Sequence, residues 1–347
     1  MKTKLLWILI ASSIVACNKE GEEEEPVVQS GVKIYVSNEG NFGASNADVS
    51  YIDAAGVIHN DVYQAVNDMP LGDVLQSLSL DGNVAYAVMN NSNKIAVFNA
   101  QNFTALRTID GLTYPRHIFH LNQNKAYVSS GSGAGLVHVL NKSTNTLGAA
   151  IPVGNGPENM TVSNGYLYVC NSGGWGEDNT VSVIDTESDL LFTNITVSDQ
   201  PVDAVTDANG DIWVLCKGQT IYDNSWNIIG HTDAFLCHID RDQNEVLTFF
   251  NVGQNGDHPY SMTISNNGQD IYIANGDIHH MSIDGIALET IIEGDFATVD
   301  VLAQNDYLWL TGVNDFVNPG RVYAYTKSGT LVRSYTAGVG ANGVVGN

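Results

Sequence analysis

Positive charge is scarce in this chain: 14 Lys and Arg stand against 38 Asp and Glu, so the formal net charge is −24. Phosphate backbones repel such a chain, and nucleic acid is not expected among its partners. The four cysteines show no CxxC or His-x-x-x-His spacing, so no metal site is expected. Cys170, Cys216 and Cys237 are either three buried thiols in strands or one disulfide and one thiol.

Long hydrophobic runs, helix-period segments, a nucleophile elbow and a phosphate-binding loop are also lacking. The apolar run from Leu5 to Ala16 follows Lys2 and Lys4, is too short to span a bilayer and ends at Cys17. This pattern predicts a secretory signal peptide over residues 1–16. The alternative is an ordinary secreted protein in which the position of Cys17 is a coincidence.

The segment Ile14-Val15-Ala16-Cys17 resembles the lipobox of bacterial lipoproteins. The resemblance implies that Cys17 is the lipidated mature N-terminus. Residues 17–30 are acidic and lack core-forming residues, which predicts a solvated tether with no fold of its own. An acidic run so close to the cysteine resembles the surface-export signal of Bacteroidota lipoproteins, and the alternative is a plain acidic spacer.

A short strand phrase with a central aromatic residue recurs seven times over residues 31–347. The aromatic residues are spaced 37 to 59 residues apart, as expected for one four-stranded blade of a β-propeller. They are Tyr35, Tyr86, Tyr127, Tyr168, Trp213, Tyr272 and Trp309. Period-2 stretches such as 180–185 and abundant Gly and Asn favour an all-β chain. We therefore predict a single seven-bladed β-propeller over residues 31–347.

Each repeat divides into strands A (innermost) to D (outermost), with the recurring aromatic residue on strand B. The repeats begin with strand B near Val32 and end with a strand A over Ala341–Val345. This predicts that the C-terminal strand A joins the N-terminal strands B, C and D and closes the ring. Asp or Asn recurs at the end of strand C, where a side chain that caps its own turn is a better explanation than a metal or catalytic site.

The A–B and C–D turns are short, whereas several B–C loops are long and carry aromatic residues. Because the B–C and D–A loops share one face of a propeller, called the loop face below, we expect ligand contact there. The aromatic candidates are Phe42, Trp175, Tyr222, Trp226 and Phe316. The alternative is that each ring folds back over its own blade.

Four D–A loops share an x-Pro-x-x pattern, at Pro115, Pro157, Pro201 and Pro259. Proline restricts the entry into strand A, so the next two side chains should surround the mouth of the central channel. The predicted polar rim consists of Asp73, Arg116, His117, Glu158, Asn159, Asp203, Tyr260 and Thr298. Such a rim is suited to a small molecule.

A catalytic interpretation is the weaker one. His117, Glu158 and Asp203 could act as acid, base or metal ligands, as in propeller lactonases and hydrolases, but they have no spacing diagnostic of a reaction. His279 and His280 are adjacent on a strand and point to opposite faces, so they cannot jointly hold a metal. We expect a protein that is not an enzyme and needs no cofactor.

The repeated forms Tyr168-Val-Cys-Asn171 and Tyr272-Ile-Ala-Asn275 resemble YncE-like, quinoprotein-type seven-bladed propellers. The first repeat, with Asn38-Glu-Gly-Asn-Phe-Gly43, is similar to surface propeller lipoproteins of Bacteroidota, which include BtuG-type cobalamin-binding proteins. The resemblance implies a lipid-anchored protein on the cell surface of the outer membrane. It also implies capture of a ligand, with a cobalamin-type corrinoid as the candidate, for a TonB-dependent transporter.

Three functions therefore stay open. The leading hypothesis is a ligand-binding surface lipoprotein, with a corrinoid as the most specific candidate. The second is an interaction propeller that docks on an outer-membrane transporter or another surface protein through Trp175 and Trp226. The third is a hydrolase or lactonase at the channel mouth that depends on His117 and Glu158.

Overall fold

The computed structural model describes residues 33–131, 133–254, 256–285, 287–302, 306–312 and 315–346. The predicted signal peptide, Cys17 and the acidic tether lie outside the described residues. In the described ranges, no helix is long and apolar enough to cross a membrane.

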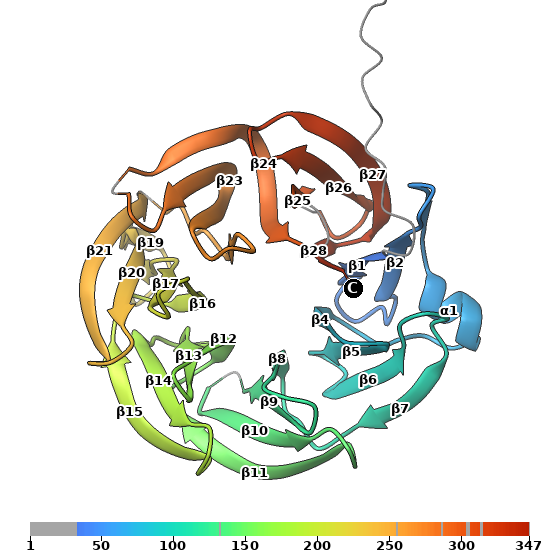
Figure 1. Ribbon diagram of the computed structural model, residues 1–347, viewed down its shortest axis with the longest axis horizontal. Coiled ribbons are helices and arrows are strands. Elements are labelled where there is room, and N and C mark those ends of the chain that lie inside the picture. The colour runs from blue at the N-terminus through green and yellow to red at the C-terminus, as the bar shows by residue number, and fades with distance from the viewer. Residues whose placement is uncertain are drawn as a thin grey trace, which may run out of the picture.

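The strands form a ring of radially arranged antiparallel sheets around a central channel (Figure 1). Five separate four-stranded sheets occur among the described residues. They are, from the channel outward, β28 (Ala341–Gly346), β1 (Ile34–Asn38), β2 (Asp48–Ile52) and β3 (Ile58–His59); β4 (Leu75–Asp81), β5 (Val84–Met89), β6 (Lys94–Asn99) and β7 (Ala105–Ile109); β8 (Pro115–His120), β9 (Lys125–Ser130), β10 (Gly135–Asn141) and β11 (Thr146–Val153); β12 (Pro157–Ser163), β13 (Tyr166–Asn171), β14 (Thr180–Asp185) and β15 (Leu190–Thr196); and β16 (Pro201–Thr206), β17 (Ile212–Cys216), β20 (Ala234–Asp240) and β21 (Glu245–Gly253).

A six-stranded sheet occupies the remaining arc of the ring. Its strands, in order, are β22 (Ser261–Ile264), β23 (Asp270–Ser282), β24 (Glu289–Val301), β25 (Tyr307–Gly312), β26 (Pro319–Thr326) and β27 (Leu331–Val339). β23 and β24 are each 13 residues long. The backbone N–H of Ile283, just after β23, donates to the carbonyl of Gln269, just before it, so this strand folds back on itself.

The ring closes through the two ends of the described chain. β28 pairs antiparallel with β1, in a register that runs from Ile34 opposite Gly346 to Asn38 opposite Ala341. The predicted closure by the C-terminal strand is therefore confirmed, and the outer strands of the first sheet come from the N-terminal side of the chain.

The core lies between neighbouring sheets. Within the described part of the chain, buried apolar side chains form seven clusters around the ring. All seven recurring aromatic residues are at most 3% exposed. The strand B aromatic residues therefore pack between sheets, as predicted, and burial of such large side chains stabilises the contact between adjacent sheets.

Polar side chains at the ends of the third strands cap their own turns. Asp185 Oδ1 accepts from the backbone N–H groups of Glu187 and Ser188, and Asn141 Oδ1 accepts from Ser143 and Thr144. Carboxylate and amide oxygens at this position accept from backbone N–H groups of the turn, which have no partner on a neighbouring strand. The capping interpretation of these recurring residues is confirmed.

Two elements depart from the all-strand prediction. A short helix, α1 (Val62–Asn67), follows β3, and the carboxylate of Asp48 accepts from the backbone N–H groups of Tyr63 and Gln64. Asp48 thereby satisfies donors that a helix start leaves unpaired. The long connection after β17 is a hairpin of β18 (Thr220–Tyr222) and β19 (Ile228–His231), which forms a two-stranded sheet of its own.

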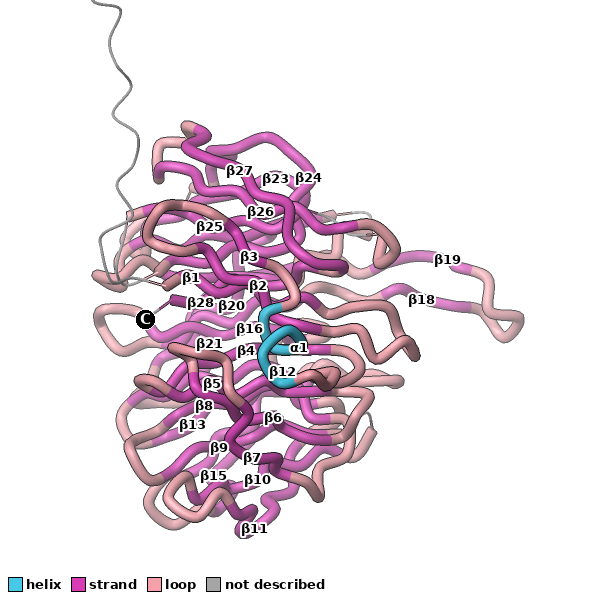
Figure 2. Tube along the Cα trace, turned by 90° about the vertical axis from the view of Figure 1, so that its right-hand side faces the viewer, coloured by secondary structure: helices cyan, strands magenta, loops and turns pink. Residues whose placement is uncertain are grey.

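Figure 2 shows this hairpin extending beyond the ring on one side, while the C-terminus lies on the other. The hairpin belongs to the loop face, because it connects the second and third strands of its sheet. The C-terminal end of β28 therefore lies opposite the face where the candidate ligand-contacting loops gather.

Candidate functional site

The innermost strands have irregular pairing at their first residues, and these residues form the centre of the loop face. β8 pairs Pro115 with Ser130 and Ile118 with Val128, so two residues, at positions 116 and 117, lie opposite Ser129 alone. Such a β-bulge can turn consecutive side chains toward one site. β12 repeats this shift between Pro157 and Met160. The proline pattern in the sequence thus marks a bulge that presents residue pairs to the channel mouth.

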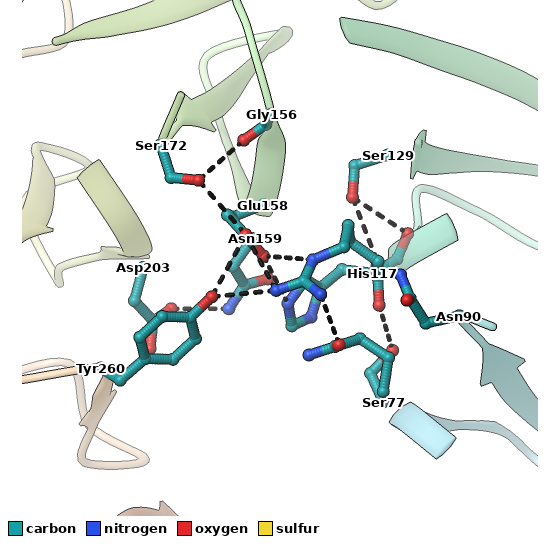
Figure 3. A network of polar contacts seen from close by, with 12 residues as sticks. Ser77, Asn90, His117, Ser129, Gly156, Glu158, Asn159, Ser172, Asp203 and Tyr260 are labelled. Atoms are coloured by element: carbon teal, nitrogen blue, oxygen red, sulfur yellow. Dashed lines mark hydrogen bonds and ion pairs between the residues drawn. The ribbon is translucent and has the colours of Figure 1, made fainter. Parts of the chain in front are cut away.

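Arg116 is the hub of a polar network at this site, and Figure 3 shows its partners Glu158 and Tyr260. Its Nε and one Nη each donate to Glu158, over 2.9 Å, in a bidentate ion pair. The same Nη donates to the Tyr260 hydroxyl at 2.9 Å, and the other Nη donates to Gln76. The guanidinium therefore connects residues from β4, β8 and β12 and the residue that precedes β22.

Both members of the ion pair are held in their charged forms. Burial alone would raise the pKa of Glu158, but Arg116 and His117 beside it hold that pKa at about 2. Burial opposes the charge of Arg116, yet the pull of Glu158 dominates and raises the guanidinium pKa above its ordinary value. A carboxylate held this firmly in its ionised form is a poor proton donor near neutral pH.

A cavity of about 530 Å³ occupies the central channel next to this network. Its acidic and imidazole lining comes from Glu39, His117, Asp203 and Asp300. Asp203 accepts from the Asn159 side chain at 2.6 Å and, with its other oxygen, from a backbone N–H at 2.8 Å. The channel therefore combines carboxylates with amide donors along its wall.

Burial changes the titration of the channel carboxylates. It raises the pKa of Asp203 to about 6, although hydrogen bonds from Met262 and Asn159 act in the opposite direction. Burial also raises the pKa of Asp300 to about 7, and the nearby charge of Asp203 contributes to this shift. Two carboxyl groups in one channel thus titrate near neutral pH.

A second cavity, of about 220 Å³, opens beside Arg116 and Glu158. Four consecutive sheets contribute to it the residue that follows their second strand: Asn90, Gly131, Ser172 and Lys217. Each stands four positions after the recurring aromatic residue. Tyr114, Tyr260, Gly174 and Trp175 complete the lining.

The structure brings most of the predicted rim together and leaves several candidates outside. Eight predicted residues line one cavity, namely Arg116, Glu158, Trp175, His117, Asn159, Asp203, Thr298 and Phe316, and Tyr260 lines both. Asp73 instead accepts from the Gly43 backbone and from Asn91, so it orders the first loop. Phe42 is 81% exposed and, like Tyr222 and Trp226 on the β18–β19 hairpin, lines neither cavity.

Sequence reasoning missed Gln76, Lys217 and Asp300 as site residues. Lys217 carries a readable signal, because it is four residues after Trp213 and the equivalent positions in three preceding repeats share its cavity. Gln76 and Asp300 lie on strands that do not begin with the x-Pro-x-x pattern, so the pattern used for the rim did not reach them.

The described part of the chain also brings three ligand-type side chains together on the opposite face. One atom of each of Asp207, Asp211 and His238 lies within 4.8 Å of the others. Asp207 already accepts from two backbone N–H groups of its turn and from Trp213 Nε1, and His238 stacks on Trp213 with centroids 4.1 Å apart. These contacts show that Asp207 and His238 stabilise the turn and the packing of Trp213, and we assign the cluster a structural role.

Comparison with known proteins places the chain in a family. The model of the family described as Domain of unknown function (DUF5074) matches residues 32–305. The chain belongs to the DUF5074 family. This DUF5074 chain is also 29% identical over 137 residues to the seven-bladed beta-propeller protein Rv1057 of Mycobacterium tuberculosis, a match that covers 38% of the chain and 34% of the relative. The match thus spans about a third of that relative's length.

Solved structures similar to this DUF5074 chain share its fold at low sequence identity. Kuenenia stuttgartiensis hydrazine synthase matches with a TM-score of 0.65 at 14% identity, over 84% of this chain and 96% of that one. A functionally unknown protein from Desulfotomaculum acetoxidans has a TM-score of 0.65 at 15% identity, over 90% and 98%. A quinonprotein alcohol dehydrogenase-like protein from Bacteroides thetaiotaomicron has a TM-score of 0.63 at 14% identity, over 91% and 78%. These similarities establish a propeller fold.

Proposed function

We propose that this protein binds a small or medium-sized ligand on the loop face of a seven-bladed propeller. One observation supports this most directly: a buried, bidentate Arg116–Glu158 pair lines the smaller of two cavities, and Tyr260, which bonds to both members of the pair, lines both cavities. Concave sites with a few oriented polar groups are typical of ligand binding. The blade count of seven is part of the proposal, with the six-stranded sheet as two blades that share the long strands β23 and β24.

A binding role fits the electrostatics better than a hydrolytic one. Glu158 has a pKa held at about 2, and both of its oxygens accept from Arg116. His117 Nε2 is 3.7 Å from Glu158 Oε2, longer than a hydrogen bond. A general acid or base needs a proton that can move near neutral pH. Glu158 is therefore unsuited to the acid–base role that the hydrolase hypothesis gives it. Asp203 and Asp300 do titrate near neutral pH, but they accept from the backbone N–H groups of Met262 and Val344, and we assign them to the structure of the channel wall. We propose a binding protein without enzymatic activity or cofactor.

The most specific ligand candidate remains a cobalamin-type corrinoid. A broad macrocycle could lie on the exposed aromatic side chains, of which Trp175 is 86% exposed, while channel amides contact its polar edge. We further propose lipidation at Cys17, location on the cell surface of the outer membrane and transfer of the ligand to a TonB-dependent transporter. These proposals come from the sequence resemblance.

Calorimetry with cyanocobalamin, cobinamide and haem tests the ligand class. We expect saturable binding of a corrinoid by the wild type and at least about tenfold weaker binding by Trp175→Ala, since base-sized stacking partners contribute on the order of 1–3 kcal/mol. Phe192→Ala, a similarly exposed aromatic residue on the outer strand β15, serves as the matched control. If none of the three compounds gives heat or a spectral change, the tetrapyrrole proposal is wrong.

Purification from the source membrane tests the wider proposal. Mass spectrometry of the native protein should detect a retained small molecule that Arg116→Met loses. A native preparation that never carries a ligand, together with negative calorimetry, would contradict a binding role for the loop face.

A second function, docking on a protein partner, has one observation in its favour. The β18–β19 hairpin exposes Tyr222, Trp226, Ile228 and Ile229 away from both cavities. Exposed aromatic and aliphatic side chains on an extended arm are suited to a protein interface. If this function is correct, Trp226→Ala abolishes co-purification of the partner and leaves small-molecule binding unchanged.

A further inference from the structure

The charged side chains that line the 220 Å³ cavity are mostly positive, whereas the protein as a whole is strongly acidic. The whole chain carries 38 acidic residues against 14 Lys and Arg. The charged side chains that line this cavity are Arg116, Lys217 and Glu158, two cations and one carboxylate. Because Glu158 is bound to Arg116 in a bidentate pair, no carboxylate of the lining remains to balance the positive charge of Lys217.

Lys217 has no carboxylate within ion-pair distance among the residues that the structure describes. Other lysines in those ranges do: Lys125, Lys142 and Lys327 lie 2.6 to 2.8 Å from Asp189, Asp81 and Asp306. The Lys217 ammonium lies over the ring of Tyr260, with Nζ 4.9 Å from the ring centroid. Burial lowers the pKa of Lys217, consistent with a charge that lacks a full set of partners.

The cavity is lined by aromatic rings, and the glycines of its lining contribute no side chains to fill it. Gly131 contributes no side chain, and Tyr114 and Tyr260 are 38% and 40% exposed. Trp175 follows Gly173 and Gly174, which have positive φ angles, and its ring is 86% exposed. The empty space corresponds to roughly seven water molecules at about 30 Å³ each. A compact, flat group of that size fits beside the lysine.

From these contacts we infer that the Lys217 cavity binds a small organic anion, a carboxylate carried on a flat apolar group. The carboxylate accepts from the Lys217 ammonium, and Ser172 and Asn90 are polar neighbours in the same lining. The apolar part packs against the tyrosine rings, with Trp175 as the ring at the entrance. The inference rests on the proposed ligand-binding role of the loop face and names one chemical class for part of it.

Calorimetry with benzoate and benzamide tests this inference, because the two probes have the same shape and differ in charge. We expect the wild type to bind one benzoate and to bind benzamide at least tenfold more weakly. Lys217→Met should weaken benzoate binding at least tenfold. Lys94→Met is the matched control: that lysine also lacks a carboxylate partner among the described residues, lines neither cavity and should leave benzoate binding unchanged.

Thermal unfolding shows whether Lys217→Met folds. We expect its Tm to equal or exceed that of the wild type, because the variant removes a partly buried charge that has no carboxylate partner. Equal affinity for benzoate and benzamide, unchanged benzoate binding by folded Lys217→Met, or absence of benzoate binding by the wild type would each overturn the inference.

The outcomes also separate this inference from the wider proposal. If the wild type and Lys217→Met bind cyanocobalamin equally and neither binds benzoate, the loop face still binds a ligand and only the anion site is wrong. If benzoate binds through Lys217 while no corrinoid or native ligand is found, the corrinoid proposal is wrong and the anion site remains.

Discussion

At the residue scale, Arg116 determines how the centre of the loop face is held. Its side chain is 21% exposed, and that of its partner Glu158 is 6% exposed, so water screens their attraction little. Tyr260 and Ser172 also bond to Glu158, at 3.1 and 3.3 Å. Removal of one charge therefore leaves the other buried among groups arranged for an ion pair.

A double-mutant cycle measures this coupling. We predict that Arg116→Met lowers the free energy of unfolding by about 3 kcal/mol or more, because it leaves an unpaired buried carboxylate. Glu158→Gln should be destabilising for the converse reason. The double variant should be more stable than the sum of the single effects allows, as urea unfolding can determine. Additive effects within about 0.5 kcal/mol would show that the two charges do not depend on each other.

The channel carboxylate Asp300 gives a prediction for pH. Its pKa is raised to about 7 in the fold, above its ordinary value, so between about pH 4 and 7 the folded protein binds a proton that the unfolded chain has released. This contribution to stability is present below pH 4 and is lost as the pH rises through 7. Asp300→Asn should therefore raise Tm relative to the wild type, and by more at pH 8 than at pH 5.

Calorimetric Tm values at the two pH values test this prediction. Asp284→Asn, a substitution of an exposed aspartate, is the control and should shift Tm equally at both. A difference between Asp300→Asn and the wild type that does not change with pH would mean that Asp300 titrates as an ordinary carboxyl group.

At the element scale, much of the site could be predicted from strand register. The proline pattern predicted Arg116, Glu158 and Asp203 because a proline restricts where strand A begins, and the bulge that follows is local. The direction of a long loop depends on tertiary contacts. Phe42 and Asp73 therefore fell outside the cavities, although their residue types suited the prediction.

Periodicity could have identified more of the site than the proline pattern did. In four consecutive repeats, the residue four positions after the recurring aromatic residue lines the same cavity, and Lys217 is one of these residues. The position of the aromatic residue is therefore enough to identify Lys217. Asp300 could not be found this way, because it lies within the 13-residue strand β24, which joins two successive parts of the six-stranded sheet.

The β18–β19 hairpin lies outside the sheets of the ring, and we expect the ring to be stable without it. It forms a separate two-stranded sheet, and its contacts with the rest of the described chain include Thr220 with His258 at 3.0 Å. We predict that replacement of residues 220–231 by Asn-Gly, a two-residue hairpin turn, changes Tm by no more than about 3 °C, roughly 1 kcal/mol. A much larger fall in Tm would show that the hairpin supports the ring.

At the scale of the whole molecule, stability depends on closure. A propeller ring avoids free sheet edges at its ends only if the first and last parts of the chain complete one sheet. Here β28 supplies the innermost strand of the first sheet, and Val344 and Ala341 are buried in the cluster that joins β28 to β25 and β26. Val344 N–H also donates to Asp300 at 2.9 Å, so β28 contacts the channel wall as well.

Deletion of residues 341–347 should therefore destabilise the entire ring. The truncated protein loses a buried valine, which contributes about 1.5–3 kcal/mol, and the β28–β1 hydrogen bonds, which contribute about 0.5–1.5 kcal/mol each. We predict a fall in Tm on the order of 10 °C, in one cooperative transition. A chain that ends at Gly346 is the control and should melt like the wild type. Equal Tm values for the truncated and full-length proteins would contradict closure as a source of stability.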